Sequence, residues 1–235
     1  MYARCIKSKI HPATWVVIGL KQTALGTQIL HRGTAFAVDS IGHLLTCWHV
    51  TFMDQDCQVD CDEFIVAQPE LAPAQYVAKL VKKEKNSDIA LLKIDGAVRT
   101  KPIRLVDQTV PFGRSCCAFG HPLSMQDPTT NSMRIFTRAA AGIVSMPYQA
   151  AGLVNGGKPV RYYELDFFTH GGSSGGPVFR RNGDTFAWVR ASLLLDDGTG
   201  NKKRSNLSVA VDIREAIEFL KPLNINLQIR RSFWG

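Results

Sequence analysis

Short apolar segments alternate with Gly, Pro, Asn and Asp along almost the whole chain. Segments of this kind, rich in β-branched and aromatic residues and bounded by turn formers, are typical of β-strands. The predicted strands are 15–20, 33–38, 63–67, 76–81, 89–94, 116–119, 134–145, 161–165, 177–179, 186–195 and 207–211. Asn182-Gly183 predicts a hairpin turn between two of them. The pattern indicates an all-β protein, built as a sandwich or a barrel.

One long helix is predicted, near the C-terminus over about 212–221. Asp212 is a suitable N-cap and Glu215 follows three residues later, as in a capping box. Pro222 ends the segment. The apolar residues at helical spacing are Ile213, Ala216, Ile217 and Leu220.

No linker or long-period repeat divides the chain, so we expect a single domain over residues 1–235. The segments 123–131 and 150–159 carry the densest loop signals, and we expect them to be the most mobile.

Composition and charge exclude several classes of protein. Apolar residues make up 45% of the chain, which excludes wholesale disorder. No apolar stretch approaches the ~20 residues that span a bilayer, so no membrane partner is expected. The net charge of +8 is compatible with an acidic partner, but no nucleic-acid-binding motif accompanies it, and nucleic acid is a disfavoured partner. The basic clusters lie at 82–85, 180–181, 201–204 and 230–231.

The N-terminus and the cysteines indicate a compartment. The apolar run from Trp15 to Leu20 is shorter than the ~7–15 residues of a signal-peptide core. Six cysteines are present, and the adjacent pair Cys116-Cys117 is awkward to bridge, so reduced thiols and a cytoplasmic location are expected. Cys57, Cys61 and that pair leave a zinc site open as a disfavoured alternative, so we expect no metal or cofactor.

The strongest chemical signal is Gly171-Gly172-Ser173-Ser174-Gly175-Gly176-Pro177. A nucleophilic serine needs a tight turn that exposes its hydroxyl, with backbone N–H groups free to hold an oxyanion. Glycines around Ser174 permit both. A plain Gly/Ser-rich connector is the alternative.

The position of the histidines selects between serine-hydrolase classes. The Gly-x-Ser-x-Gly spacing also fits α/β-hydrolases, whose general base follows the serine in the chain. Every histidine here precedes Ser174, which eliminates that class and leaves the order His, Asp, Ser. The histidines are His11, His31, His43, His49, His121 and His170.

His49 and Asp88 are the candidate base and acid. His49 follows two predicted strands and lies on a short helical turn expected from Thr46. Asp88 stands at the mouth of the strongly apolar strand 89–94, where a carboxylate can orient an imidazole. Either residue alone is more simply structural.

Three segments, in this order, carry a resemblance to a known family. They are Gly-Thr-Ala-Phe-Ala-Val with His-Leu-Leu-Thr-Cys-Trp-His-Val, then Ser-Asp-Ile-Ala-Leu-Leu-Lys-Ile, then Gly-Gly-Ser-Ser-Gly-Gly-Pro-Val. Together they resemble the signatures of trypsin-like serine peptidases, and most of all those of bacterial HtrA/Deg-type domains. Asp166 and Asn182-Gly183-Asp184 match that branch as well, and the resemblance spans about residues 14–220.

The resemblance implies a fold and a catalytic machinery. The fold is two six-stranded antiparallel β-barrels of the chymotrypsin type, over about 10–105 and 110–211, followed by the helix. His49 is then general base and acid, Asp88 the orienter and Ser174 the nucleophile. The backbone of Gly172, Ser173 and Ser174 supplies the oxyanion hole.

Departures from the family pattern shape the expected function. We expect no PDZ domain within residues 1–235 and therefore no protease-chaperone role. Ser173 stands where the family has Asn or Asp. The predicted specificity pocket lacks the acid that selects Lys or Arg, so a small or medium apolar side chain fits best. His170 recognising an acidic residue is a second reading, and a structural loop role for His170 is favoured over it. The expected pocket residues are Phe168, Thr169 and His170 on one wall and Arg190, Ala191, Ser192 and Leu193 on the other.

The sequence therefore predicts an intracellular serine endopeptidase that makes limited cuts in a chosen protein or peptide substrate, with a possible activating protein partner. Two alternatives remain: a latent or non-catalytic protein-binding module on the same fold, and a nucleic-acid-binding barrel supported only by the basic charge.

Overall fold

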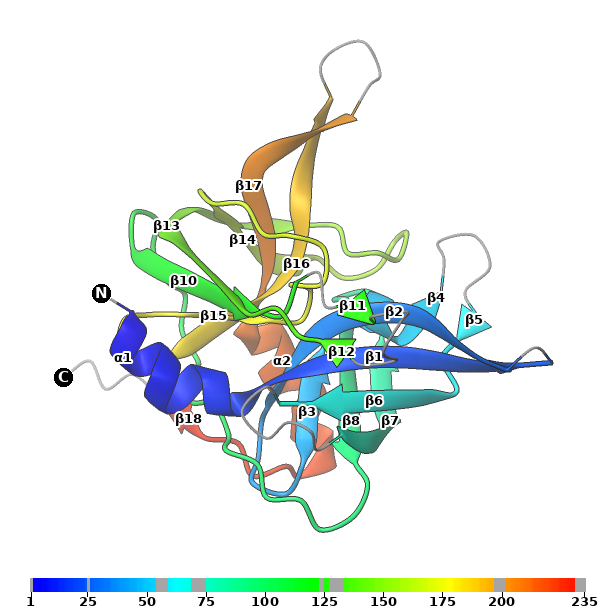
Figure 1. Cartoon of the computed structure of the whole chain (residues 1–235). Helices are drawn as coiled ribbons and strands as arrows, with labels where there is room; N and C mark the ends of the chain where they lie inside the picture. The colour runs from blue at the N-terminus through cyan, green and yellow to red at the C-terminus, as the bar shows by residue number, and fades with distance from the viewer. Residues whose placement is uncertain are drawn as a thin grey trace.

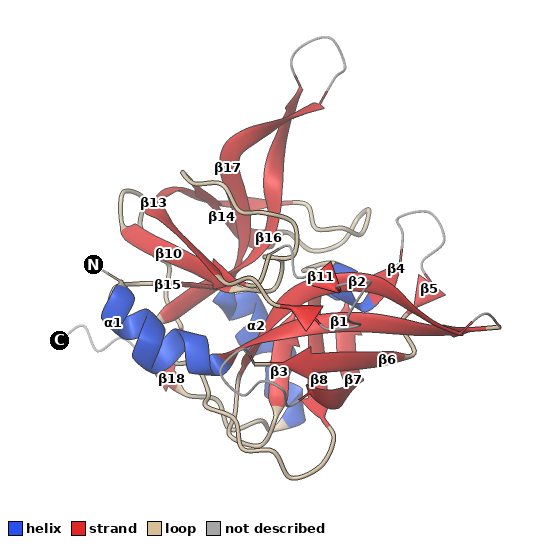
Figure 2. Ribbon diagram, in the orientation of Figure 1, coloured by secondary structure: helices blue, strands red, loops and turns tan. Residues whose placement is uncertain are grey.

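Two β-barrels pack side by side in the computed structural model (Figure 1). The structure describes residues 2–24, 26–53, 59–68, 75–122, 125–126, 133–196 and 202–230. Strands dominate both halves, and helices are confined to the N-terminal segment, short turns and one C-terminal helix among the described residues (Figure 2). The expected double barrel is therefore confirmed.

The first barrel closes in the order β1-β2-β3-β8-β7-β6, and every pairing in it is antiparallel. Its strands are β1 (Thr14–Thr23), β2 (Gly26–Ala37), β3 (His43–Thr46), β6 (Glu63–Ala67), β7 (Gln75–Glu84) and β8 (Ile89–Ile94). β8 is buried along nearly its whole length, because one face fills the barrel and the other is covered by the neighbouring structure. This position brings the residue before β8 to the centre of the molecule.

The second barrel closes in the order β15-β10-β13-β14-β17-β16, with β16 pairing back to β15. Its strands are β10 (Ser115–Gly120), β13 (Arg138–Ala150), β14 (Val160–Leu165), β15 (Pro177–Phe179), β16 (Thr185–Asp196) and β17 (Lys202–Asp212). β9 (Leu105–Val106) and β18 (Ile229–Arg230) extend β16 in parallel. The hairpin between β15 and β16 contains Asn182-Gly183, as predicted.

Two small hairpins complete the strand inventory of the described residues. They are β4 (Phe52–Met53) with β5 (Val59–Asp60), and β11 (Met125–Gln126) with β12 (Met133–Arg134). The segment 123–131, expected to be mobile, lies outside the described residues except for β11.

The N-terminal segment is helical, which the sequence pattern did not predict. Helix α1 (Ala3–Cys5) continues as a π-helical turn, Ile6–Ile10, and a 3₁₀ turn, His11–Ala13. Cys5, Ile10 and Ala13 are the buried hydrophobic residues of this segment, so only a few of its side chains belong to the core. Tyr2 packs edge-on against Phe179 in β15.

The C-terminal helix α2 (Ile213–Leu220) begins and ends close to the predicted bounds. Asp212 caps it by accepting from the backbone N–H of Arg214 at 2.9 Å. The expected capping box is not formed, because Glu215 instead accepts from the backbone and the guanidinium of Arg161 in β14. The helix is thereby attached to the second barrel.

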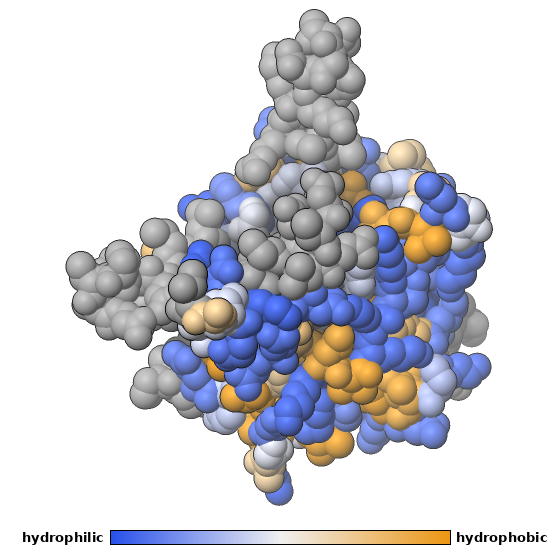
Figure 3. All heavy atoms as spheres, turned by 90° about the vertical axis from the view of Figure 1, so that its right-hand side faces the viewer, coloured by the Kyte–Doolittle hydropathy of each residue, from blue (hydrophilic) through white to orange (hydrophobic). Residues whose placement is uncertain are grey.

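On the face shown in Figure 3, hydrophilic residues dominate and hydrophobic residues lie in several groups among them. No helix in the described part of the chain is long and apolar enough to cross a bilayer.

Candidate active site

His49 lies on a 3₁₀ turn, Trp48–Thr51, that follows β3 directly. Because β3 pairs with β8, this turn lies beside the residue that precedes β8. The backbone N–H of His49 donates to Asp88 Oδ1 at 3.0 Å, and Nδ1 lies 2.8 Å from Asp88 Oδ2. The carboxylate thus holds His49 by both backbone and ring, which orients the imidazole.

Asp88 is almost completely buried, with 1% of its side chain exposed. Its backbone is left-handed, with φ +54°, a conformation that Asp tolerates better than most residues. The Nε atom of Arg190 lies 3.6 Å from Asp88 Oδ2. The acid therefore receives N–H groups from the first barrel and a cation from the second.

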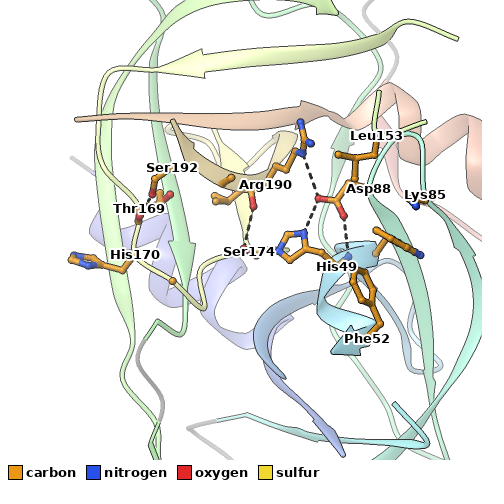
Figure 4. Close-up of a pocket in the computed structure, with 14 residues that line it drawn as sticks. His49, Phe52, Lys85, Asp88, Leu153, Thr169, His170, Ser174, Arg190 and Ser192 are labelled. Atoms are coloured by element: carbon orange, nitrogen blue, oxygen red, sulfur yellow. Dashed lines mark hydrogen bonds and ion pairs between the residues drawn. The ribbon is translucent and has the colours of Figure 1, made fainter. Parts of the chain in front are cut away.

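Ser174 lies in the glycine-rich turn before β15. Gly175 follows with φ +85°, and a Cβ there would come within 2.0 Å of the backbone oxygen of Thr34. Only glycine fits this close approach of the two barrels. The Ser174 hydroxyl donates to the backbone carbonyl of Arg190 at 3.1 Å, and the His49 ring lies between Asp88 and Ser174 (Figure 4).

The backbone before Ser174 forms a type II turn. Gly172 has φ +90°, and the N–H of Ser173 donates to the carbonyl of His170 at 3.0 Å. The N–H groups of Gly172 and Ser174 donate to no acceptor among the described residues. The expectation that Ser173 contributes to an oxyanion hole is corrected, because its N–H is already donated within the turn.

These side chains line one cleft of about 610 Å³ between the barrels. Its lining residues are Trp48, His49, Phe52, Lys85, Asp88, Leu153, Thr169, His170, Gly171, Ser174, Val189, Arg190, Ala191 and Ser192. The volume is within the range of ligand-binding clefts.

The predicted pocket residues fall into three groups. Thr169, His170, Arg190, Ala191 and Ser192 line the cleft. Ser192 Oγ donates to the Thr169 carbonyl at 2.5 Å, joining the two walls. Phe168 lines a different hollow, with its ring packed edge-on against His170. The side chain of Leu193 lies outside the described residues.

Arg190 and His170 are held in place by contacts that their predicted roles did not include. The Arg190 guanidinium lies on Asp88 and over the Tyr162 ring, 5.5 Å from its centroid. His170 Nε2 lies 2.6 Å from an Arg138 guanidinium nitrogen. A guanidinium can only donate, so His170 Nε2 accepts a hydrogen bond from Arg138.

The described cysteines that were considered as zinc ligands lie in different parts of the structure. Cys57 lies outside the described residues, and Cys116 and Cys117 are buried in β10, where burial raises the pKa of each thiol to about 12. In the described part of the chain, the only group of three or more side chains whose atoms lie close enough to bind one metal ion is Cys47, His49 and Asp88. Burial raises the pKa of Cys47 well above its usual range, and its Sγ donates to the Val189 carbonyl, so Cys47 is poorly suited to ligate a metal.

Several residues near the cleft had no place in the sequence prediction. Trp48, Phe52, Lys85 and Leu153 line it, and Thr34 and Asn86 make contacts between the barrels. Thr34 lies in the segment Gly-Thr-Ala-Phe-Ala-Val. No local pattern in that segment marks Thr34 as functional, because its partners are backbone groups distant in the chain.

Comparison with known proteins places the chain among peptidases. A family model described as "Trypsin-like peptidase domain" matches residues 33–187, more than half of the chain.

A protein of Pseudomonas putida (strain W619) named "Probable periplasmic serine endoprotease DegP-like" is 28% identical over 204 residues, covering 86% of this chain and 37% of the relative. "Protease Do-like 5, chloroplastic" of Arabidopsis thaliana is 24% identical over 184 residues, covering 77% of this chain and 54% of the relative. The chain therefore spans only part of the length of these relatives.

The solved structure "HtrA-type protease AlgWS227A with tripeptide" superposes with a TM-score of 0.71 at 21% identity, covering 95% of this chain and 63% of that one. This likeness concerns the fold.

Proposed function

The chain belongs to the family of trypsin-like peptidase domains, and from that premise we propose that it is a serine endopeptidase with His49, Asp88 and Ser174 as its catalytic triad. The observation that carries the proposal is the two-point hold of buried Asp88 on His49, at 3.0 and 2.8 Å, in the cleft that also contains Ser174. The unpaired N–H groups of Gly172 and Ser174 support it, because a tetrahedral intermediate needs such donors.

In the proposed first step, Ser174 Oγ leaves its hydrogen bond to the Arg190 carbonyl and attacks the substrate carbonyl carbon. His49 takes the hydroxyl proton as the Oγ–C bond forms. The carbonyl oxygen becomes an oxyanion that accepts from the N–H groups of Gly172 and Ser174. Asp88 stabilises the imidazolium and remains ionised.

In the proposed second step, the C–N bond breaks and His49 donates its proton to the leaving amine. This leaves an acyl-enzyme on Ser174. Water then attacks the ester carbon while His49 takes the proton of the water, and return of that proton to Ser174 Oγ releases the acid.

A fluorophosphonate probe tests the assignment on wild type, His49→Ala and Ser174→Ala. We expect labelling of the wild type only, because the probe needs an activated serine. With a cleavable ester, Ser174→Ala should lower kcat by about 10⁶. Labelling that persists in Ser174→Ala refutes the assignment of the nucleophile.

We further propose that the pocket accepts a small or medium apolar side chain at the cleaved residue. Val189, Ala191 and the hydroxyl-bearing Thr169 and Ser192 line it, and no carboxylate lies among the described residues of that wall. Cleavage of a peptide library after Lys or Arg alone would refute this specificity.

The resting position of the Ser174 hydroxyl favours one alternative, a latent or non-catalytic protein-binding module. Its proton is donated to the Arg190 carbonyl, and nucleophilic attack requires its rotation. Limited cleavage of one target under the control of an activating partner fits this arrangement. Probe labelling in cell lysate but not in the purified protein would support partner activation, and no labelling in either supports the binding module.

We propose a reducing compartment, the cytoplasm, for the protein. The described cysteines are free thiols: Cys5, Cys47, Cys61, Cys116 and Cys117. The Pseudomonas putida relative named above is described as periplasmic, so the location of this protein has to be measured directly. Fractionation of cells that carry the tagged protein tests this location. Recovery of the protein from a periplasmic fraction would refute the proposal.

A further inference from the structure

Thr34 in β2 belongs to the first barrel, but its hydrogen bonds hold the backbone around Ser174 in the second. The side chain is fully buried and does not line the cleft. Its Oγ1 donates to the Gly172 carbonyl at 2.8 Å, and its backbone N–H donates to the Ser174 carbonyl at 2.9 Å. One residue thus binds the carbonyls on both sides of Ser173.

The first of these contacts fixes the peptide between Gly172 and Ser173. Its carbonyl accepts from Thr34 Oγ1, and its N–H donates to the His170 carbonyl at 3.0 Å. A peptide plane held at both ends cannot rotate without losing a hydrogen bond that is costly to leave unmade in a buried position.

The second contact fixes the peptide between Ser174 and Gly175 in the same way. Its carbonyl accepts from the Thr34 N–H, and its N–H donates to the Val189 carbonyl at 2.8 Å. The two held peptides lie on either side of the peptide between Ser173 and Ser174, which carries the Ser174 N–H. The N–H groups of Gly172 and Ser174 donate to no acceptor among the described residues.

The Thr34 hydroxyl is itself oriented. It accepts from the backbone N–H of His121 at 2.9 Å, just after β10. Its single proton is therefore available for the Gly172 carbonyl. The hydroxyl joins three segments: β2, the end of β10 and the turn before Ser174.

We propose that Thr34 is a positioning residue for the oxyanion hole. Its hydroxyl holds the peptide between Gly172 and Ser173, which links the two peptides that carry the Gly172 and Ser174 N–H groups, so that both N–H groups face one acceptor. This inference rests on the proposed function. Thr34 touches no substrate, and its effect on the rate acts through the Gly172 backbone. Such a role predicts a loss in the rate of the chemical step with little change in substrate binding.

The test compares wild type, Thr34→Val, Thr34→Ser and Ser174→Ala. Valine keeps the shape of threonine without the hydroxyl, and serine restores the hydroxyl. Acylation by p-nitrophenyl acetate gives two quantities for each variant, the maximal rate and the half-saturating ester concentration. Stability is followed in parallel by urea unfolding.

Thr100→Val is the matched control. Thr100 follows β8 and is buried against the turn between β2 and β3. It donates to the Asp39 carbonyl at 2.7 Å and accepts from the Gly42 N–H at 3.1 Å. It therefore makes the same pair of contacts as the Thr34 hydroxyl, but none with the turn before Ser174. Both valine variants should lose stability, and only Thr34→Val should lose rate.

We expect Thr34→Val to acylate about 10- to 100-fold more slowly, a smaller effect than loss of an oxyanion donor. The half-saturating concentration should stay within about twofold, and Thr34→Ser should recover most of the rate. Should the valine variant fail to fold, Thr34→Ala is expected to show the same loss.

Three results would overturn the role of Thr34: an unchanged rate in the variants without the hydroxyl, no recovery in Thr34→Ser, or an equal loss in Thr100→Val. Equal acylation of wild type and Ser174→Ala would instead refute the proposed function. The two failures are thus distinguishable.

Discussion

At the scale of single residues, Asp88 combines a backbone conformation that few side chains accept with an almost fully buried carboxylate. Its φ is +54°, and its two oxygens receive the backbone N–H and the ring Nδ1 of His49. Unusual backbone conformations are tolerated where surrounding contacts determine them, and such residues cluster at active sites.

Asp88→Asn tests whether this carboxylate orients and stabilises the His49 ring. Asn tolerates a left-handed backbone as well as Asp does, so the fold should survive. The amide lacks the charge that stabilises an imidazolium and favours the wrong tautomer. We expect kcat for an ester to fall by about 10³- to 10⁴-fold, with urea unfolding near that of the wild type. An ester rate close to wild type would show that Asp88 is not the orienting acid.

Sequence patterns identified some residues of the candidate site and missed others for a physical reason. Asp88 and Ser174 stand beside local signals, an apolar strand and a glycine-rich turn. Arg190 lines the cleft, and its contact with Asp88 was not predicted, because a side chain's direction depends on packing. Thr34 had no local signal of its role, since its partners lie on segments distant in the chain.

At the scale of elements, the loop 151–159 is attached to the first barrel by Asn86. The Asn86 carbonyl accepts from Leu153 N–H at 3.0 Å, its Oδ1 accepts from Val154 N–H at 3.3 Å, and its Nδ2 donates to the Lys158 carbonyl at 2.8 Å. A mobile loop was expected here from composition. These contacts link the loop to the turn before Asp88 and place Leu153 at the cleft.

Asn86→Ala should release this loop. Removing the amide leaves loop N–H and carbonyl groups without partners, at a cost of about 1–3 kcal/mol in the free energy of unfolding. We expect faster hydrogen exchange across 151–158 and a KM raised several-fold for a peptide substrate, with a smaller change in kcat.

Asn182→Ala is the control for this change. Asn182 lies in the hairpin between β15 and β16 and bonds to Asp184, far along the chain from the loop. If exchange of 151–158 is the same in Asn86→Ala and Asn182→Ala, Asn86 does not hold the loop.

The apolar pattern predicted strands best where most of the strand is buried. β6, β8 and β15 have the predicted bounds. β2, β16 and β17 extend further than predicted, because their outer ends lack the apolar pattern. β13 was predicted to end before Met146-Pro147, but it continues past a register shift between Val144 and Met146, where an irregularity accommodates proline.

At the scale of the whole molecule, buried Asp184 ties together three distant segments. Arg104, in the connection between the barrels, and Arg230, in β18, both pair with its carboxylate. Burial would raise the pKa of Asp184, but the hydrogen bonds from Arg230 and Arg104 outweigh it and lower the pKa below the ordinary value of 3.8.

Because the pKa of Asp184 is lowered in the folded state, the direction in which the stability of the fold changes with pH can be predicted. A carboxyl whose pKa is lowered in the folded state contributes stability above its unfolded pKa, and that stability is lost as pH falls through the folded value. We expect Asp184→Asn to be less stable than the wild type at pH 7, with the difference shrinking below about pH 4. Urea unfolding between pH 7 and pH 3 measures it.

Asp107→Asn, on an exposed residue of the same connection, is the control and should leave the pH profile of stability unchanged. A difference between wild type and Asp184→Asn that stays constant from pH 7 to pH 3 would contradict the assigned ion pairs.

The double barrel was predicted from the order of three motifs, whereas the contacts between the barrels were not. β9 and β18 are two residues long and pair in parallel, and strands this short leave no periodic signal. The N-terminal helical segment was not predicted either, because few of its residues are buried.

The most direct test of the proposed triad is to identify the residue that carries the covalent intermediate. The protein is mixed with p-nitrophenyl acetate, quenched in acid within the acylation phase, digested and mapped by mass spectrometry. We predict an acetyl group on Ser174 in the wild type, and none at that peptide in His49→Ala. Absence of acetylation in the wild type, or acetylation of another residue that accounts for the ester turnover, would contradict the proposed triad.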